Sequence, residues 1–284
     1  MIWFPIIGAI ALASGTIFEK IVLRKKSVDI KLYQTATFLA IVISILPFVY
    51  FFWEISPLAF TTRNLLIFVA VIFFSMIANM FIFYSLKWEK ISNIEPARIL
   101  EPLFVILLAI LFSFFVNPEL YERNTQVIIP ALIAGLALIF SHVKKHHIRF
   151  NKYFIAAILG SLFFALELVV SRLILDFYSP ITFYFLRCSM IFLLSLVIFQ
   201  PTFKKLDKKA SKIVLLTGAI WSIYRIIIYY GYLAYGVIST TLIVMLAPVF
   251  IYLFAWKFLK EKINWRNMIA ALVILVCVGY AMLG

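Results

Sequence analysis

The chain consists mostly of apolar runs that are long enough to cross a lipid bilayer. A helix rises about 1.5 Å per residue, so about 20 apolar residues span about 30 Å of hydrocarbon. These runs are too long and too uniformly apolar to be the alternating strands of a membrane β-barrel. We therefore predict an all-α integral membrane protein with ten transmembrane helices. They lie near residues 3–23, 33–53, 64–86, 93–116, 125–142, 154–175, 182–199, 212–234, 237–258 and 267–283.

The composition argues against a soluble domain. Hydrophobic residues make up 65% of the chain and charged residues 13%, against about 25% charged residues in soluble proteins. The first run starts at Met1 without a basic segment or a small-residue cleavage site, so we expect a retained helix. Cys188 and Cys277 both lie within apolar runs and suggest neither a disulfide nor a metal site. We expect no cofactor.

The net charge of +14 is distributed in a way that orients the protein in the membrane. Of the 26 Lys and Arg residues, twenty lie in odd-numbered connectors, three in even-numbered connectors and three inside helices. Basic residues accumulate in the cytoplasmic loops of membrane proteins. We therefore predict cytoplasmic odd-numbered connectors and both termini outside. The charge does not require a nucleic-acid partner, and we expect none.

One apolar segment occurs twice. The sequence "LEPLFVILLAILF" (100–112) returns as "LAPVFIYLFAWKF" (246–258), with six of thirteen positions identical. Equivalent connectors in the two halves carry opposite charge bias, as two inverted five-helix halves require. We predict two such repeats around a central cavity, at 1–143 and 154–284, joined by a cytoplasmic connector at 144–153.

Two further motifs resemble those of a known family. The first run ends in "GTIFEK" (15–20), and the second half contains "YGYLAYGVISTTLIVMLAPVF" (230–250). With ten helices in fewer than 300 residues, the chain resembles the EamA-type branch of the drug/metabolite transporter superfamily. The resemblance implies a multi-pass plasma-membrane transporter whose cavity is lined mainly by helices 1, 3, 4, 6, 8 and 9. Many members have cytoplasmic termini, whereas the charge count predicts the opposite here.

Charged residues inside the predicted helices are the first candidates for function. An ionised group in the centre of a membrane costs at least about 2.5–3.5 kcal/mol, so such groups usually have a role. Glu95, Arg98 and Glu101 follow one another at i, i+3 steps and share one helix face. They form either a self-neutralising ion cluster or a site in which Glu101 carries a proton or a substrate.

Three more charged residues lie at similar depth in helices 6, 7 and 8. Glu167, Arg187 and Arg225 are each roughly 12–13 residues from the cytoplasmic end, or about 18–20 Å. A buried pair between Glu167 and one arginine would leave the other arginine without an internal partner. Arg187 is the better structural candidate and Arg225 the better substrate ligand.

Aromatic residues accompany Arg225. Trp221, Tyr224 and Tyr232 share its helix face, either as packing residues or as walls of a binding site. The guanidinium group suits a carboxylate or a phosphate. Asn79 in helix 3 is a further polar candidate.

Proline recurs with the repeated segment. Pro102 and Pro248 occupy equivalent positions, so we expect a helix in each half that is locally broken near the midplane. The first half carries one extra residue near Glu95 and Pro96, where a break could also fall. Glu101 is replaced by Ala247 in the second half, so the site is asymmetric.

These patterns favour a secondary transporter that exports small polar metabolites, such as amino acids, by alternating access. The expected partners are the lipid bilayer, the small-molecule substrate and a proton or another coupling ion, with the protein as a monomer or homodimer. An exporter of multiple drugs or organic cations is the alternative, and a non-transporting scaffold is less favoured. An intramembrane enzyme lacks support because the histidines show no metal-binding spacing: His142, His146 and His147.

Overall fold

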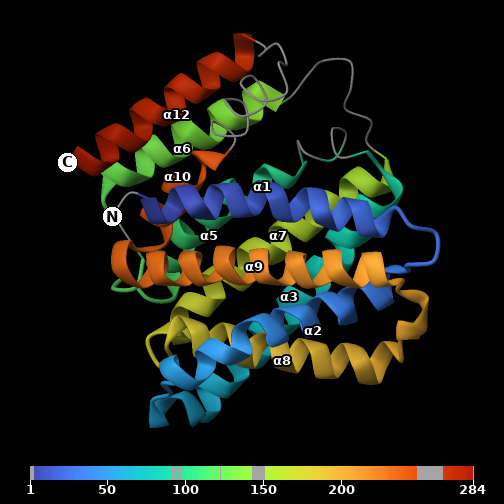
Figure 1. Ribbon diagram of the computed structural model, residues 1–284. Coiled ribbons are helices and arrows are strands. Elements are labelled where there is room, and N and C mark those ends of the chain that lie inside the picture. Colours follow the sequence, from blue (N-terminus) through green and yellow to red (C-terminus); the bar gives the residue numbers. More distant parts are fainter. Residues whose placement is uncertain are drawn as a thin grey trace.

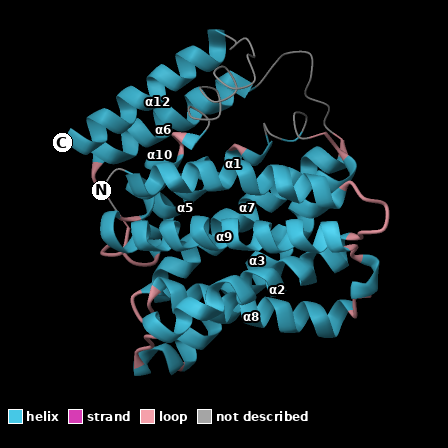
Figure 2. Cartoon of the chain, viewed as in Figure 1, coloured by secondary structure: helices cyan, strands magenta, loops and turns pink. Residues whose placement is uncertain are grey.

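The computed structural model describes residues 3–90, 94, 97–121, 123–142, 151–247 and 265–283. Within these residues the chain forms ten α-helices and no strand longer than an isolated bridge (Figure 2). The helices are α1 (Trp3–Leu23), α2 (Ile30–Phe52), α3 (Thr62–Trp88), α5 (Leu100–Phe115), α6 (Thr125–His142), α7 (Lys152–Leu175), α8 (Pro180–Phe199), α9 (Lys208–Tyr235), α10 (Val237–Val244) and α12 (Trp265–Leu283). Two short 3-10 helices, η1 (Pro57–Phe60) and η2 (Phe203–Lys205), lie in connectors.

Each predicted apolar run contains one of these helices, so the all-α membrane prediction is confirmed. Among the described residues, five helices are long and apolar enough to cross a membrane: α2, α3, α7, α8 and α9. Helices α5, α6 and α12 are shorter and also apolar. The start of α1 and the end of α12 lie on the same side of the bundle (Figure 1).

Polar side chains fix the starts of several helices. The first amide groups of a helix have no partner within it, and an Asp, Asn or Ser just before the helix can accept their hydrogen bonds. Asn151 accepts from two amides at the start of α7, at 2.9 and 3.0 Å, and Asp207 accepts from one at the start of α9, at 2.6 Å. Asp207 also binds Lys25 at 2.7 Å, and this hydrogen bond lowers the pKa of the Asp207 carboxyl group.

The helix pairs follow the symmetry expected of two inverted repeats. Helix α2 packs against α8, and α6 packs against α12, which pairs helix 2 with helix 7 and helix 5 with helix 10 (Figure 1). Helix α3 packs against α7, and α1 packs against α9. In the repeat α1 corresponds to α7 and α3 to α9, so exchanging the two halves converts one of these pairs into the other. The predicted connector at 144–153 falls largely outside the described residues, so the boundary between the halves stays a prediction.

Each half also contains a helix break at the equivalent position. A turn at Ile99 precedes α5, and Met245 begins a turn after α10. These two residues are 146 positions apart, the spacing of the repeated segment. A proline lacks the amide that would bond the carbonyl four residues earlier. Pro102 and Pro248 therefore weaken the helix just before each turn, although Pro248 itself lies outside the described residues.

A glycine brings α9 close to α2. A Cβ atom added to Gly218 would lie 2.7 Å from the carbonyl carbon of Ala40 and 2.8 Å from the amide nitrogen of Ile41. Only a residue without a side chain allows the two backbones to approach so closely. This contact holds α9 in place one turn before Trp221, where the candidate site begins.

Candidate functional site

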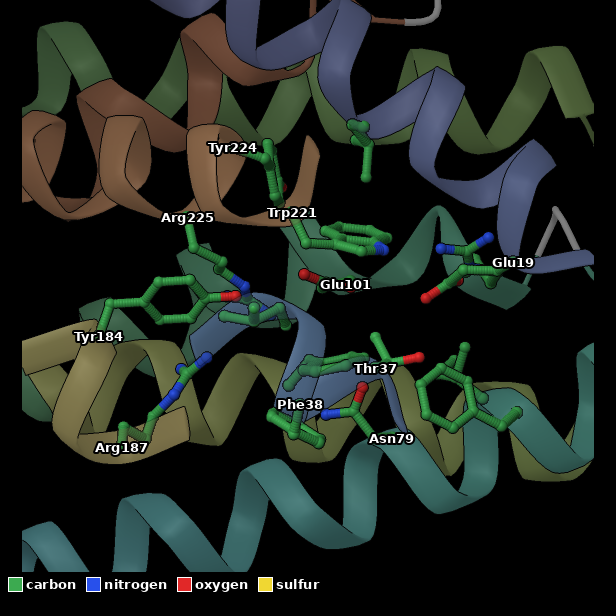
Figure 3. Close-up of a pocket in the computed structure, with 16 residues that line it drawn as sticks. Glu19, Thr37, Phe38, Asn79, Glu101, Tyr184, Arg187, Trp221, Tyr224 and Arg225 are labelled. Carbon is green, nitrogen blue, oxygen red and sulfur yellow. The ribbon is translucent and has the colours of Figure 1, made fainter. Parts of the chain in front are cut away.

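A small cavity lies among seven helices. Its volume is about 40 Å³, enough for only a few water molecules. Five of the six helices predicted to line it do so, namely α1, α3, α5, α7 and α9, and α2 and α8 contribute as well. No described residue of α10, the predicted helix 9, lines it. The lining residues are Leu12, Glu19, Thr37, Phe38, Ile41, Asn79, Ile82, Phe83, Arg98, Glu101, Phe164, Tyr184, Arg187, Trp221, Tyr224 and Arg225 (Figure 3).

Two arginines share one buried carboxylate beside this cavity. Glu167 on α7 is fully buried and forms an ion pair with Arg187 on α8. Its other oxygen, Oε2, is 3.3 Å from Nη1 of Arg225 on α9. Tyr229 donates a hydrogen bond of 2.7 Å to Oε1, and Arg187 donates to the Tyr229 hydroxyl oxygen. We call Glu167, Arg187 and Arg225 the guanidinium triad.

The triad changes one detail of the sequence interpretation. Arg187 pairs with Glu167, as expected of a structural residue, but Arg225 also has a carboxylate partner. Neither of the two arginines is therefore without a partner. The triad contains one negative and two positive charges, so it keeps a surplus of one positive charge next to the cavity.

Aromatic rings surround both guanidinium groups. Arg225 lies 5.0 Å from the ring centroid of Phe164 and 5.9 Å from that of Tyr224. Arg187 lies 4.7 Å from the ring of Tyr184. A cation over an aromatic face is stabilised by about 0.5–2 kcal/mol, and more when water is excluded. The rings therefore help to hold charged groups in a site with little water.

Glu101 lies in the first turn of α5 and faces the cavity (Figure 3). Among the described residues it makes no ion pair and no hydrogen bond through its carboxylate. Arg98 is turned instead toward α1, where it donates a 3.2 Å hydrogen bond to the Thr16 hydroxyl oxygen. The turn at Ile99 separates the two residues, so they do not pair with each other. Glu95 lies outside the described residues.

Glu19 is a cavity residue that the sequence interpretation missed. It is buried on α1 and points into the same space as the indole of Trp221 (Figure 3). The indole nitrogen of Trp221 is buried and has no hydrogen-bond partner among the described residues. A Cβ atom on Gly15 would lie 3.1 Å from the indole ring, so this glycine makes room for it. The "GTIFEK" motif contained the signal, because Glu19 falls within the first apolar run.

The remaining sequence candidates divide between cavity and core. Asn79 on α3 lines the cavity. Its amide nitrogen donates a hydrogen bond of 2.7 Å to the Ser75 carbonyl oxygen one turn earlier. Trp221 and Tyr224 line the cavity and contact each other edge to face, with centroids 5.4 Å apart. Tyr232 is buried in the core and does not line the cavity.

Comparison with known proteins shows a family relationship for this arrangement. Residues 151–283 match the EamA-like transporter family. The match covers 133 of the 284 residues, so the second half of the chain is similar to this family. A solved crystal structure aligns with 98% of this chain and 98% of its own chain, with a TM-score of 0.65 and 17% identity, and this likeness concerns the fold alone. A comparison with curated proteins finds no match.

This similarity, together with the long apolar helices, supports a multi-pass membrane transporter of the drug/metabolite transporter superfamily. Its substrate is therefore a small molecule. Within the part of the chain that the structure describes, no group of three His, Cys, Asp or Glu residues is placed to hold a metal ion. The charged and aromatic groups of the cavity are thus the described groups available for recognition.

At one end of the bundle, two lysines bind the ends of neighbouring helices. Lys20 of α1 donates to the carbonyl oxygens of Leu86 and Glu89 at the end of α3. Lys87 of α3 donates to the Leu23 carbonyl oxygen at the end of α1, at 3.2 Å. Because the last carbonyls of a helix have no partner within it, these bonds stabilise both helix ends. We call these reciprocal contacts the lysine caps.

Proposed function

We propose that this protein exports small metabolites that carry a carboxylate, with amino acids first, by alternating access. The observation that carries the proposal is the surplus positive charge of the guanidinium triad beside an aromatic cavity. Arg225 binds Glu167 through a single contact of 3.3 Å, so its fork retains donors for a second carboxylate.

The rest of the cavity suits the other parts of an amino acid. Glu101 has no ion pair within 4 Å among the described residues, and Glu19 lies beside the buried indole nitrogen of Trp221. Either carboxylate can receive the ammonium group of a zwitterion. The rings of Trp221 and Tyr224 can contact an organic side chain and exclude water from the ion pairs.

The size of the cavity supports a transport cycle with a closed intermediate. A volume of about 40 Å³ is too small for an amino acid, so the helices must separate to admit one. The lysine caps hold the end of α1 against the end of α3 in this conformation. Arg172 in "ELVVSRLIL" (167–175) corresponds to Lys20 in "GTIFEKIVL" (15–23), and here it binds Asp176, directly after its own helix, at 2.7 Å. In the opposite conformation we expect Arg172 to bind the end of α9, while Lys20 releases α3.

The energy for export comes from an ion gradient in this proposal. A carboxylate that faces the cavity without a fixed partner can take up a proton in one conformation and release it in the other. Glu101 meets this description among the described residues. Proton uptake would then alternate with substrate binding to the triad.

Transport into liposomes tests the proposal. Purified protein is reconstituted, and uptake of labelled amino acids is measured with and without a pH gradient. We expect uptake by the wild type and by the control Arg63→Gln, whose side chain lies at the exposed start of α3. We expect loss of uptake in Arg225→Gln. Uptake of carboxylates that survives Arg225→Gln contradicts the proposal.

Organic-cation export is the second candidate. Glu19 and Glu101 line the cavity, and Glu167 lies beside it with Arg225 held at 3.3 Å. If the ion pair with Glu167 leaves Arg225 no free donor for a substrate, the carboxylates of Glu19 and Glu101 and the aromatic walls would favour a cation. The same liposomes distinguish the two candidates, because uptake of quaternary ammonium compounds would then depend on Glu101 and tolerate Arg225→Gln.

A further inference from the structure

The membrane-facing surface contains a large apolar groove that is separate from the cavity. Its volume is about 840 Å³, and it is lined mainly by α3, with further residues from α2, α7 and α8. One wall is formed by successive turns of α3, and the other by the start of α2, Phe163 of α7 and the last turns of α8. Val69, Met76 and Tyr84 mark its length along α3. Ile30 and Ile198 mark the end at which α2 begins and α8 ends.

The groove is long enough for a lipid chain. Its lining residues on α3 run from Val69 to Tyr84, a distance of about 22 Å at 1.5 Å per residue. One leaflet of the hydrocarbon core is about 15 Å thick, half of about 30 Å. An acyl chain that enters at Tyr84 can therefore stay in the groove over the full depth of its leaflet.

Two lysines stand near the end of this groove at which α2 and α7 begin: Lys31 of α2 and Lys152 of α7. Lys31 follows the groove residue Ile30, and its ammonium nitrogen lies 5.8 Å from the ring centroid of Phe199 at the end of α8. Lys152 lies 5.2 Å from the ring of Tyr153, which is 5.4 Å from the ring of Tyr84. Both lysines are exposed, and neither has an acidic partner within 4 Å among the described residues.

We propose that the groove binds an anionic phospholipid, with one acyl chain against α3 and the phosphate between Lys31 and Lys152. An apolar slot with cations at its mouth matches an amphiphile whose head group is negative. A zwitterionic lipid would place its own ammonium group near the lysines. A second copy of this chain would bring two pairs of lysines together without counter-charges, and like charges across an interface oppose association.

Photo-crosslinking in nanodiscs tests the proposal. The probe is a phosphatidylglycerol with a photoreactive group in one acyl chain, and labelled peptides are mapped along the chain. We expect labelling of α3 between residues 69 and 84 that excess phosphatidylglycerol suppresses at least fivefold and phosphatidylcholine does not. The exposed face of α12, which contains Leu272 and Val276, serves as the internal control. Labelling there should respond equally to both competitors.

Variants separate the head-group contact from the groove. Lys31→Gln with Lys152→Gln should abolish the preference for phosphatidylglycerol, while the matched pair Lys208→Gln with Lys209→Gln at the exposed start of α9 should keep it. Met76→Trp should reduce labelling of α3 by filling the groove. Equal suppression by both lipids in the wild type overturns the proposal. So does a preference that survives the loss of both lysines, or a protein–protein crosslink at the groove in place of a lipid adduct.

Discussion

Glu167 is the residue on which the charge balance of the site depends. Its carboxylate contacts Arg187, Arg225 and Tyr229, all of which are buried. Glu167→Gln would leave two buried guanidinium groups without their counter-charge. Removing one partner of a buried ion pair typically costs about 3–5 kcal/mol. We expect a marked loss of thermal stability in detergent, measured by unfolding followed with tryptophan fluorescence.

The control for this prediction is Glu119→Gln, at an exposed position outside the helices. Its melting temperature should match that of the wild type. Equal melting temperatures for Glu167→Gln and Glu119→Gln would mean that the triad contributes little to stability.

Glu101 should behave in the opposite way. Because its carboxylate makes no ion pair within 4 Å among the described residues, Glu101→Gln should keep the melting temperature of the wild type. We expect it to abolish the response of transport to an imposed pH gradient, measured as uptake into liposomes at two internal pH values. A variant that keeps this response would show that Glu101 does not carry the proton. A variant that is degraded or loses thermal stability in detergent would show that Glu101 is a structural residue.

Residue roles were only partly predictable from sequence. The helical period placed Trp221, Tyr224 and Arg225 on one face, and all three line the cavity. The sharing of Glu167 by two arginines could not be predicted, because the partners lie on three helices whose rotations depend on packing. Glu19 was not among the predicted site residues, although it falls within the first apolar run, directly before Lys20.

At the scale of single elements, the helix breaks were predictable because their cause is local. Pro102 removes an amide hydrogen bond whatever the rest of the fold does, and the turn at Ile99 follows from that loss. The bounds of α9 were less predictable. The apolar pattern suggested a start near residue 212, whereas the helix begins at Lys208, because the Asp207 side chain and a solvated first turn extend it.

The close contact between α9 and α2 leads to a prediction at the same scale. Gly218→Ala would place a Cβ atom 2.7 Å from backbone and side-chain atoms of Ala40, which cannot move without shifting α2. Overpacking of this kind typically costs about 1–3 kcal/mol. We expect a lower melting temperature and less folded protein in size-exclusion chromatography.

Gly279→Ala is the matched control, since a Cβ atom there would meet nothing within 4 Å. Both substitutions raise helix propensity equally, so the difference between them isolates the steric contact. If both variants are equally stable, α2 and α9 are more separable than the structure indicates.

At the scale of the whole molecule, the sequence predicted class, helix number and inverted repeat, since each depends on sums over many residues. The conformation could not be predicted in this way. The lysine caps and the small cavity describe one state of the bundle, and the sequence is the same in every state. The orientation in the membrane also remains a prediction from charge.

The start of α1 and the end of α12 lie on one side of the bundle (Figure 1). The excess of basic residues in odd-numbered connectors, twenty against three, predicts that this side is outside the cell. A C-terminal fusion to an enzyme that is active only outside the cytoplasm should therefore be active. Activity of a reporter that works only in the cytoplasm would reverse the orientation.

The central claim is that the guanidinium triad recognises a carboxylate, and calorimetric titration of the purified protein tests it most directly. The ligands are amino acids, the amines that lack only their carboxylate, and quaternary ammonium compounds. Hydrogen bonds to charged groups contribute about 1.5–3 kcal/mol, so Arg225→Gln should weaken amino-acid binding by about 10-fold to 150-fold. The matching amines, which lack the carboxylate, should bind the wild type and the Arg225→Gln variant equally weakly. Binding that is confined to quaternary ammonium compounds and unchanged by Arg225→Gln would contradict the claim.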